Sequence, residues 1–235
     1  MGTTRIRRRL GGWGIPALAA ALLAAPALAD DGLSTGATSR YVLDPETTVV
    51  QVEVSLDLRN VTPDQGDRYF YYDSFTVPVP AGAEDVRARS GGSALQVRLN
   101  GTEDPSTAFA RISFPDLRYG RSRTIELTYT VPGEKPRDAD STRVGPGYAT
   151  FAVEGLGDPG RTTVEVVAPT SMTFDATSDD FTASAKGATT THTATTSDDG
   201  GFWAVVSLRD PASSQERSVE VAGTSLVLSG YPDDS

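Results

Sequence analysis

The strongest constraint on the fold is a strict alternation of apolar and polar residues in the first half of the chain. The longest run lies between Pro45 and Asn60, and its apolar members are Val50, Val52, Val54, Leu56 and Leu58. A period of two places these side chains on one face of a β-strand and the polar ones on the other. The run therefore predicts a strand with one face in a core and the other in water.

The segment from Leu117 to Pro132 shows the same alternation, and we expect the other strands to assemble around it. Its apolar row is Ile125, Leu127, Tyr129 and Val131. Gly120 provides a turn before the strand, and Pro132 ends the pairing because proline has no backbone N–H. We expect this strand to join an N-terminal set of strands to a C-terminal set, with Tyr129 in the core.

Shorter alternating runs between glycine, proline and asparagine turns fill the rest of the chain, without helical spacing past the N-terminal segment. The predicted fold class is all-β, with antiparallel β-sandwich-like domains in a saddle-like sheet arrangement and an N-terminal signal helix. The expected divisions are a signal peptide at 1–29, a flexible lead-in at 30–39, a first β-sandwich-like half at 40–132, a linker loop at 133–147, a second β-sandwich-like half at 148–230 and a C-terminal end at 231–235. One continuous saddle-like domain remains the alternative to two sandwiches.

The N-terminus has the pattern of a secretory signal peptide. A basic end precedes an Ala/Leu-rich core, and the triplet Ala27-Leu28-Ala29 is a small-x-small cleavage site. Glycines and prolines in this core disfavour a permanent spanning helix. We expect cleavage after Ala29 and secretion of the chain from Asp30 onward, with a retained N-terminal anchor as the alternative.

The composition excludes several classes of function. The chain has 31 acidic and 21 basic residues and a formal net charge of −10, which disfavours nucleic acid and anionic lipid as partners. It has no cysteine, so disulfides, thiolate metal sites and cysteine nucleophiles are excluded. No cofactor is expected.

Few residues could carry catalysis or hold a metal. His192 is the only histidine, so a zinc site with two histidine ligands is impossible and a Ser-His-Asp triad would need this residue. No nucleophile motif or oxyanion loop lies near it, which favours a solvent-facing strand histidine. The calcium candidates are Asp138, Asp140, Asp198 and Asp199, because carboxylates on glycine-containing loops suit this ion. Solvated turn residues are the alternative interpretation, and no catalytic residue is assigned.

Four consecutive aromatic residues begin at Tyr69, within a strand predicted from Arg68 to Val79. Aromatic side chains favour strands and fill sandwich cores, so we expect this cluster to pack in the core. The alternative is a platform on which a carbohydrate or a peptide stacks.

Several segments taken together resemble a known family. They are Tyr41-Val42-Leu43-Asp44 with the long strand after it, Leu117-x-Tyr-Gly-x-x-x-x-Ile-x-Leu-x-Tyr, Gly147 to Phe151, Gly157 to Gly160, and Thr163 to Pro169. Between Tyr41 and Pro169 the chain resembles the β-rich N-terminal domain of gluzincin metallopeptidases of the aminopeptidase N type. More specifically, it resembles the N-terminal region of secreted actinobacterial proteins in which such a domain precedes a peptidase-like domain.

The resemblance implies an ancillary role, since the parts that carry the family's chemistry have no counterpart in this sequence. Those parts are a Gly-Ala-Met-Glu-Asn strand and a His-Glu-x-x-His helix. The function expected is a secreted non-catalytic β module that frames or binds a protein or a cell-envelope polymer through strand edges or loops. The alternatives are a fragment of an extracellular hydrolase, or an atypical one, and a structural cell-envelope protein.

Overall fold

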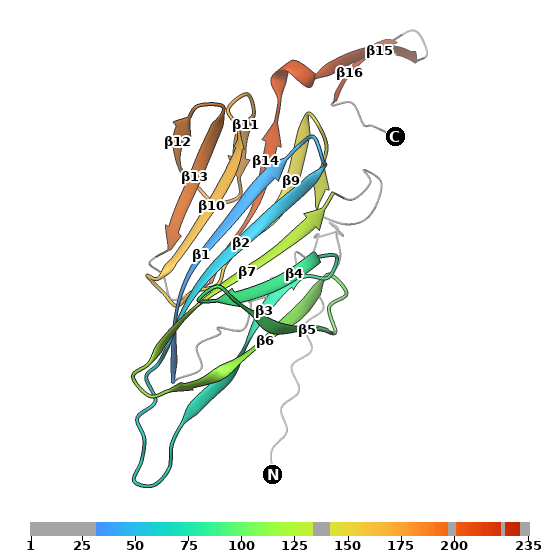
Figure 1. Ribbon diagram of the computed structural model, residues 1–235. Helices are drawn as coiled ribbons and strands as arrows, with labels where there is room; N and C mark the ends of the chain where they lie inside the picture. Colours follow the sequence, from blue (N-terminus) through green and yellow to red (C-terminus); the bar gives the residue numbers. More distant parts are fainter. Residues whose placement is uncertain (1–31, 134–141, 197–200, 222–223, 231–235) are drawn as a thin grey trace, which may run out of the picture.

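The protein is described by a computed structural model that covers residues 32–133, 142–196, 201–221 and 224–230 (Figure 1). These residues form strands, turns and one short 3-10 helix at Pro211–Ser213, which confirms the all-β fold class. The expected signal helix lies outside the described residues. None of the helices in the described ranges could span a membrane.

The strands of the described chain are numbered in sequence order. They are β1 Leu33–Asp44, β2 Val49–Asn60, β3 Tyr71–Pro80, β4 Glu84–Ser90, β5 Ser93–Gly101, β6 Thr107–Arg118, β7 Ser122–Pro132, β8 Arg143–Val144, β9 Tyr148–Gly155, β10 Thr162–Pro169, β11 Thr173–Ala176, β12 Thr182–Lys186, β13 Thr189–Thr196, β14 Phe202–Arg209, β15 Gln215–Val221 and β16 Thr224–Gly230.

The strands form two main sheets that share a core. The larger sheet has the order β12-β13-β10-β1-β2-β7-β4-β5-β6-β3, the smaller has the order β11-β14-β9-β8, and β15 pairs with β16. The apolar rows of β2, β7, β3 and β6 belong to the same buried cluster as those of β9, β10 and β14. This arrangement is sandwich-like, with mixed parallel and antiparallel pairing.

Strand β1 connects the early strands to the late ones. It pairs antiparallel with β2 and parallel with β10, so the larger sheet contains strands from before and after residues 133–147 of the sequence. The strand from residue 122 pairs instead with β2 and β4, which are both early strands. The expectation that this strand joins the two sets is therefore wrong, because the pairing with a late strand is made by β1.

The flexible lead-in expected at 30–39 is also corrected, since β1 begins at Leu33. Ser, Gly and Ala, which make up most of the residues from Leu33 to Ser39, have little strand preference of their own. The segment lies between two partner strands that pair with its backbone on both sides. Thr35 and Ser39 are completely buried there. The strand is therefore held by tertiary pairing that local sequence does not signal.

Strand β7 has the faces predicted for it. Gly120 adopts a positive φ of 72° in the turn before the strand, where a residue with a side chain would be strained. Ile125 and Leu127 are fully buried, and Tyr129 has 6% of its surface exposed. The prediction that Tyr129 lies in the core is confirmed.

Candidate functional site

The four calcium candidates Asp138, Asp140, Asp198 and Asp199 lie outside the described residues. In the described parts of the chain, no three His, Asp or Glu side chains gather closely enough to hold a metal ion. The calcium site therefore stays a prediction.

His192 was expected to face solvent, but its ring lies on the inner side of β13. It lies on β13 opposite Val166, which is fully buried, and its ring stacks on Phe174 with centroids 3.8 Å apart. Burial lowers the pKa of His192, because the charged imidazolium loses water on entering this aromatic layer. The residue packs Phe174 of the smaller sheet against the larger one.

Tyr41 is a second polar link between the sheets. Its hydroxyl accepts a hydrogen bond of 2.9 Å from the backbone N–H of Glu154 and donates one of 3.2 Å to the carbonyl of the same residue. Burial raises the pKa of Tyr41 and of Tyr129, and it raises the pKa of the Glu154 carboxyl to about 7. The Tyr41 hydroxyl therefore connects β1 to β9 by two hydrogen bonds. Because its pKa is raised, the phenol stays protonated and keeps the proton that it donates.

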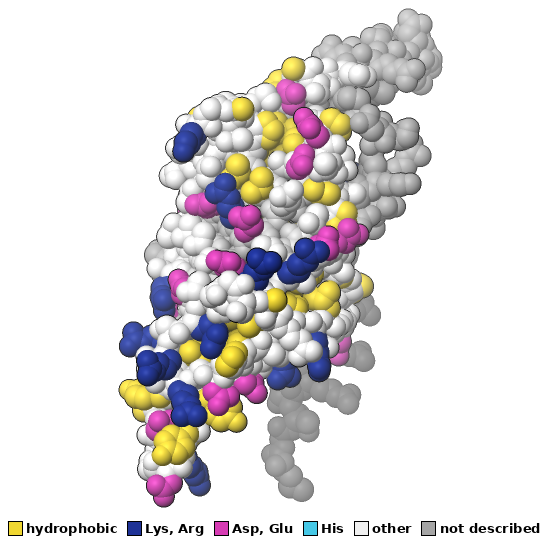
Figure 2. All heavy atoms as spheres, viewed as in Figure 1, with side chains coloured by type: hydrophobic (Ala, Val, Ile, Leu, Met, Phe, Trp, Pro, Cys, Tyr) yellow, Lys and Arg dark blue, Asp and Glu magenta, His cyan; other side chains and the backbone are white. Residues whose placement is uncertain are grey.

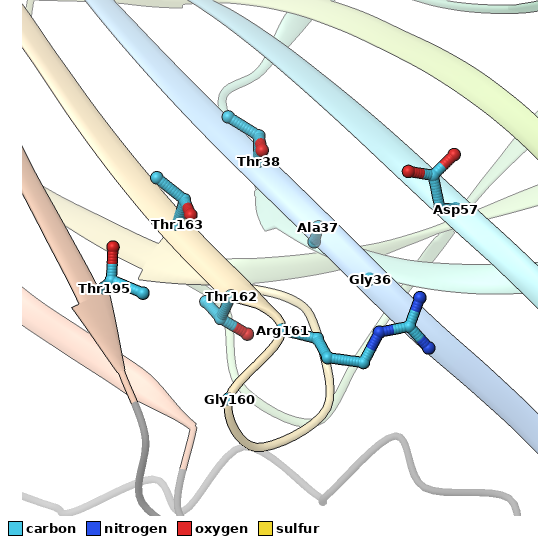
Figure 3. Close-up of a pocket in the computed structure, with 9 residues that line it drawn as sticks. All are labelled: Gly36, Ala37, Thr38, Asp57, Gly160, Arg161, Thr162, Thr163 and Thr195. Atoms are coloured by element: carbon cyan, nitrogen blue, oxygen red, sulfur yellow. The ribbon is translucent and has the colours of Figure 1, made fainter.

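A shallow polar hollow of about 260 Å³ lies on the outer face of the larger sheet (Figure 3). Thr38, Thr163 and Thr195 come from β1, β10 and β13 and are paired in register side by side. The Arg161 side chain crosses β1 over Gly36 and donates to the hydroxyl of Ser34. Pockets that enclose a small ligand measure roughly 300–1,000 Å³, so this hollow is too small and open for one.

The largest departure from expectation is at one end of the molecule. The aromatic residues Tyr69, Phe70, Tyr71 and Tyr119 have 74%, 37%, 55% and 50% of their surfaces exposed. Only Tyr72 of the four consecutive aromatics packs against the core. The expected core packing is therefore wrong for three of the four, and the residues form an exposed surface instead.

We refer to Tyr69, Phe70, Tyr71 and Tyr119 as the aromatic end. The β2–β3 connection that carries the first of these residues forms the lower end of the molecule in Figure 1, beside the β6–β7 turn. In Figure 2, hydrophobic and basic side chains lie over this end, with acidic side chains among them. Exposed aromatic surface that is contiguous and rimmed by polar residues marks interaction sites in soluble proteins.

Asn60 holds the loops that display these rings. Its side chain is completely buried, and its amide nitrogen donates to the carbonyls of Phe70 and Leu117 at 3.0 and 2.9 Å. Its side-chain oxygen accepts from the backbone N–H of Thr62 at 2.9 Å, and its carbonyl accepts from Gly120. One residue therefore links three segments of the chain, which holds the backbone beside the aromatic rings in place before any partner arrives.

Sequence reasoning missed Asn60 because an asparagine at the end of a strand is also an ordinary turn residue. The run of aromatics was noticed, but its exposure depends on where the strand β3 begins. That strand starts at Tyr71 and not at Arg68, so Tyr69 and Phe70 stay in the connection.

No protein-family model and no curated protein sequence matches the chain. Among solved structures it is similar to the M1 zinc metallopeptidase from Deinococcus radiodurans, with a TM-score of 0.43 and 16% identity over 84% of this chain and 47% of that one. It is also similar to the leukotriene A4 hydrolase from Saccharomyces cerevisiae, with a TM-score of 0.48 and 8% identity over 81% of this chain and 30% of that one. The chain spans less than half the length of these structures, and no residue role is transferred from them.

Proposed function

We propose that this chain is a secreted, non-catalytic β module that attaches to a protein or cell-envelope polymer through its aromatic end. The observation that carries the proposal is the exposure of four aromatic rings on and beside loops whose backbone is hydrogen-bonded to Asn60. Rings kept out of the core beside a backbone held in place suit a partner that covers them, because binding then orders little further chain.

The non-catalytic part of the proposal rests on the side chains available. The sequence has one histidine and no cysteine, and His192 is half-buried with its ring stacked on Phe174. The sequence resemblance to an ancillary peptidase domain points in the same direction, since the residues that do the family's chemistry have no counterpart here.

Attachment is tested by sedimentation of the purified protein with insoluble envelope material from the producing cells. We expect the protein to sediment with this material, and the double variant Tyr71→Ser, Tyr119→Ser to remain in solution. Trp203→Ser is the matched control, because Trp203 is 58% exposed on β14, away from the aromatic end. Equal sedimentation of all three proteins would overturn the proposed role of the aromatic end.

Secretion and the lack of activity need separate measurements. We expect the protein recovered from the culture medium to begin at Asp30, as read by N-terminal sequencing. We also expect no turnover of aminoacyl, peptidyl or glycosyl reporters, with or without zinc. Turnover that is lost in a His192→Ala variant of unchanged thermal stability would favour a hydrolase instead.

A further inference from the structure

The outer face of strands β3, β6 and β5 bears an unusual set of side chains. Val77, Ala110 and Ile112 are fully buried on the inner face, so their neighbours along the strands point outward. The outward residues form paired rows across the strands: Tyr71 with Arg118; Ser74 with Ser113 and Gln96; Thr76 with Arg111 and Arg98; and Pro78 with Phe109 and Asn100. These rows contain three arginines. Two carboxylates lie on the same three strands, Asp73 and Asp116, and both are exposed where the pairing of β3 with β6 is irregular.

Arg98 and Arg111 lie directly opposite each other on neighbouring strands. Like charges in this position destabilise a sheet. Among the described residues, neither they nor Arg118 form an ion pair. Arg111 donates to the hydroxyl of Ser74 at 3.0 Å, and that hydroxyl donates to the carboxylate of Asp73 at 3.0 Å. Arg111 is therefore connected to this carboxylate only through the Ser74 hydroxyl.

The other outer faces of the same sheet balance their charges. Arg40 on β1 forms an ion pair of 3.0 Å with Glu165 on β10, and Arg89 on β4 lies opposite Glu126 on β7. The chain as a whole is acidic, with a net charge of −10. On β3, β5 and β6 the three arginines outnumber the two carboxylates, and Arg98 and Arg111 lie together. This is a local reversal of charge that would attract an anionic partner.

We infer that this face and the aromatic end together bind an anionic polysaccharide, which deepens the proposed function by naming the class of partner. The guanidinium groups of Arg98 and Arg111 suit the carboxylates of acidic sugars, because guanidinium and carboxylate pair through two parallel hydrogen bonds. The exposed rings suit the C–H faces of sugar rings, whose slight positive charge meets the negative face of an aromatic ring.

The shape of the surface favours a polymer over a folded protein. Arg118 lies seven positions after Arg111 on β6, which corresponds to about 23 Å of strand. Ser74, Ser113 and Gln96 lie between them and offer neutral hydrogen-bonding groups to sugar hydroxyls. A protein interface instead concentrates its aromatic anchors at the centre and surrounds them with a polar rim.

The experiment measures binding of the purified protein to polygalacturonate by isothermal titration calorimetry and by affinity electrophoresis. Dextran of the same length is the neutral comparison, and poly-L-glutamate is the acidic polypeptide comparison. We expect binding to polygalacturonate that weakens with added salt, and little binding to the other two polymers.

Variants locate the surface. Arg98→Gln together with Arg111→Gln is expected to weaken binding about tenfold or more, and Tyr71→Ala is expected to weaken it as well. Arg87→Gln is the matched control, because Arg87 is an exposed strand arginine that already pairs with Asp85 at 2.8 Å. Thermal midpoints of all variants show whether each one is folded.

Each other outcome overturns the inference. Equal binding to poly-L-glutamate would indicate an acidic protein partner, and binding unaffected by the arginine and tyrosine changes would place the polysaccharide elsewhere. Absence of binding to polygalacturonate would reject this class of partner. Sedimentation with envelope material that still depends on Tyr71 and Tyr119 would in that case leave the proposed function standing.

Discussion

Tyr129 and Tyr119 show how differently one residue type can contribute within a short stretch of chain. Tyr129 is 6% exposed on β7, whereas Tyr119 in the preceding turn is 50% exposed. Replacing Tyr129 by alanine should lower the free energy of unfolding by about 3 kcal/mol, because it removes a buried ring and leaves a cavity. Tyr119→Ala should change it by less than about 0.5 kcal/mol.

Urea denaturation of the two variants checks this prediction. A Tyr129→Ala midpoint equal to that of the unchanged protein would mean that the inner and outer faces of β7 are reversed.

Glu154 gives the protein a pH dependence of definite sign. Burial raises its pKa from 4.5 to about 7, so between these values the native state binds a proton that the unfolded state has lost. Stability contributed by this group is therefore complete below about pH 4.5 and is lost as the pH rises through 7. Glu154→Gln should be more stable than the unchanged protein at pH 8, by about 1–2 kcal/mol, and similar to it at pH 4.

Thermal midpoints of both proteins between pH 4 and pH 8 test the effect. Glu126→Gln is the control, since Glu126 is exposed on β7. His192 titrates in both proteins, so its contribution cancels in the comparison. A Glu154→Gln difference that is the same at every pH would contradict the assigned pKa.

At the scale of elements, the parallel pairing of β1 with β10 depends on the turn before β10. Asp158 forms two hydrogen bonds of 2.7 Å with Thr35 near the start of β1. Its carboxylate accepts from the backbone N–H of Thr35, and its own backbone N–H donates to the Thr35 carbonyl. Gly157 makes this approach possible, because a Cβ atom there would lie 2.6 Å from the Arg161 carbonyl oxygen and 2.9 Å from the Ala37 nitrogen. Gly157→Ala should therefore lower the free energy of unfolding by about 1–3 kcal/mol.

Gly82→Ala is the matched control for this turn. An added Cβ at Gly82 meets nothing within 4 Å, and its φ is not positive. Equal urea midpoints for the two alanine variants would show that the turn does not hold β1 closely.

At the scale of the whole molecule, the shared sheet predicts how the protein unfolds. Strands before and after the 133–147 segment pair through β1 and β10 and contribute to one buried cluster. We therefore expect a single cooperative transition in calorimetry, with equal calorimetric and van't Hoff enthalpies. Tyr129→Ala from the early strands and Phe151→Ala from the late strands should both move this transition as a whole. Two separable transitions would indicate independent halves.

Where apolar and polar residues alternate, the sequence by itself determined the strand and its buried face. In β2 and β7 the alternation alone identifies the inner residues, because a period of two is a local property of an extended chain. The turn at Gly120 and the end at Pro132 follow from single-residue chemistry in the same way.

Only the tertiary structure decided how distant strands meet. The Leu33–Ser39 part of β1 has no strand signal, and it is ordered by partners far along the chain in β2 and β10. Tyr69 and Phe70 are exposed because Asn60 fixes their loop against the β6–β7 turn, and Arg98 faces Arg111 because β5 pairs with β6 in one register. Pairing register and loop contacts between separate segments depend on the packing of the whole chain, so no local pattern contains them.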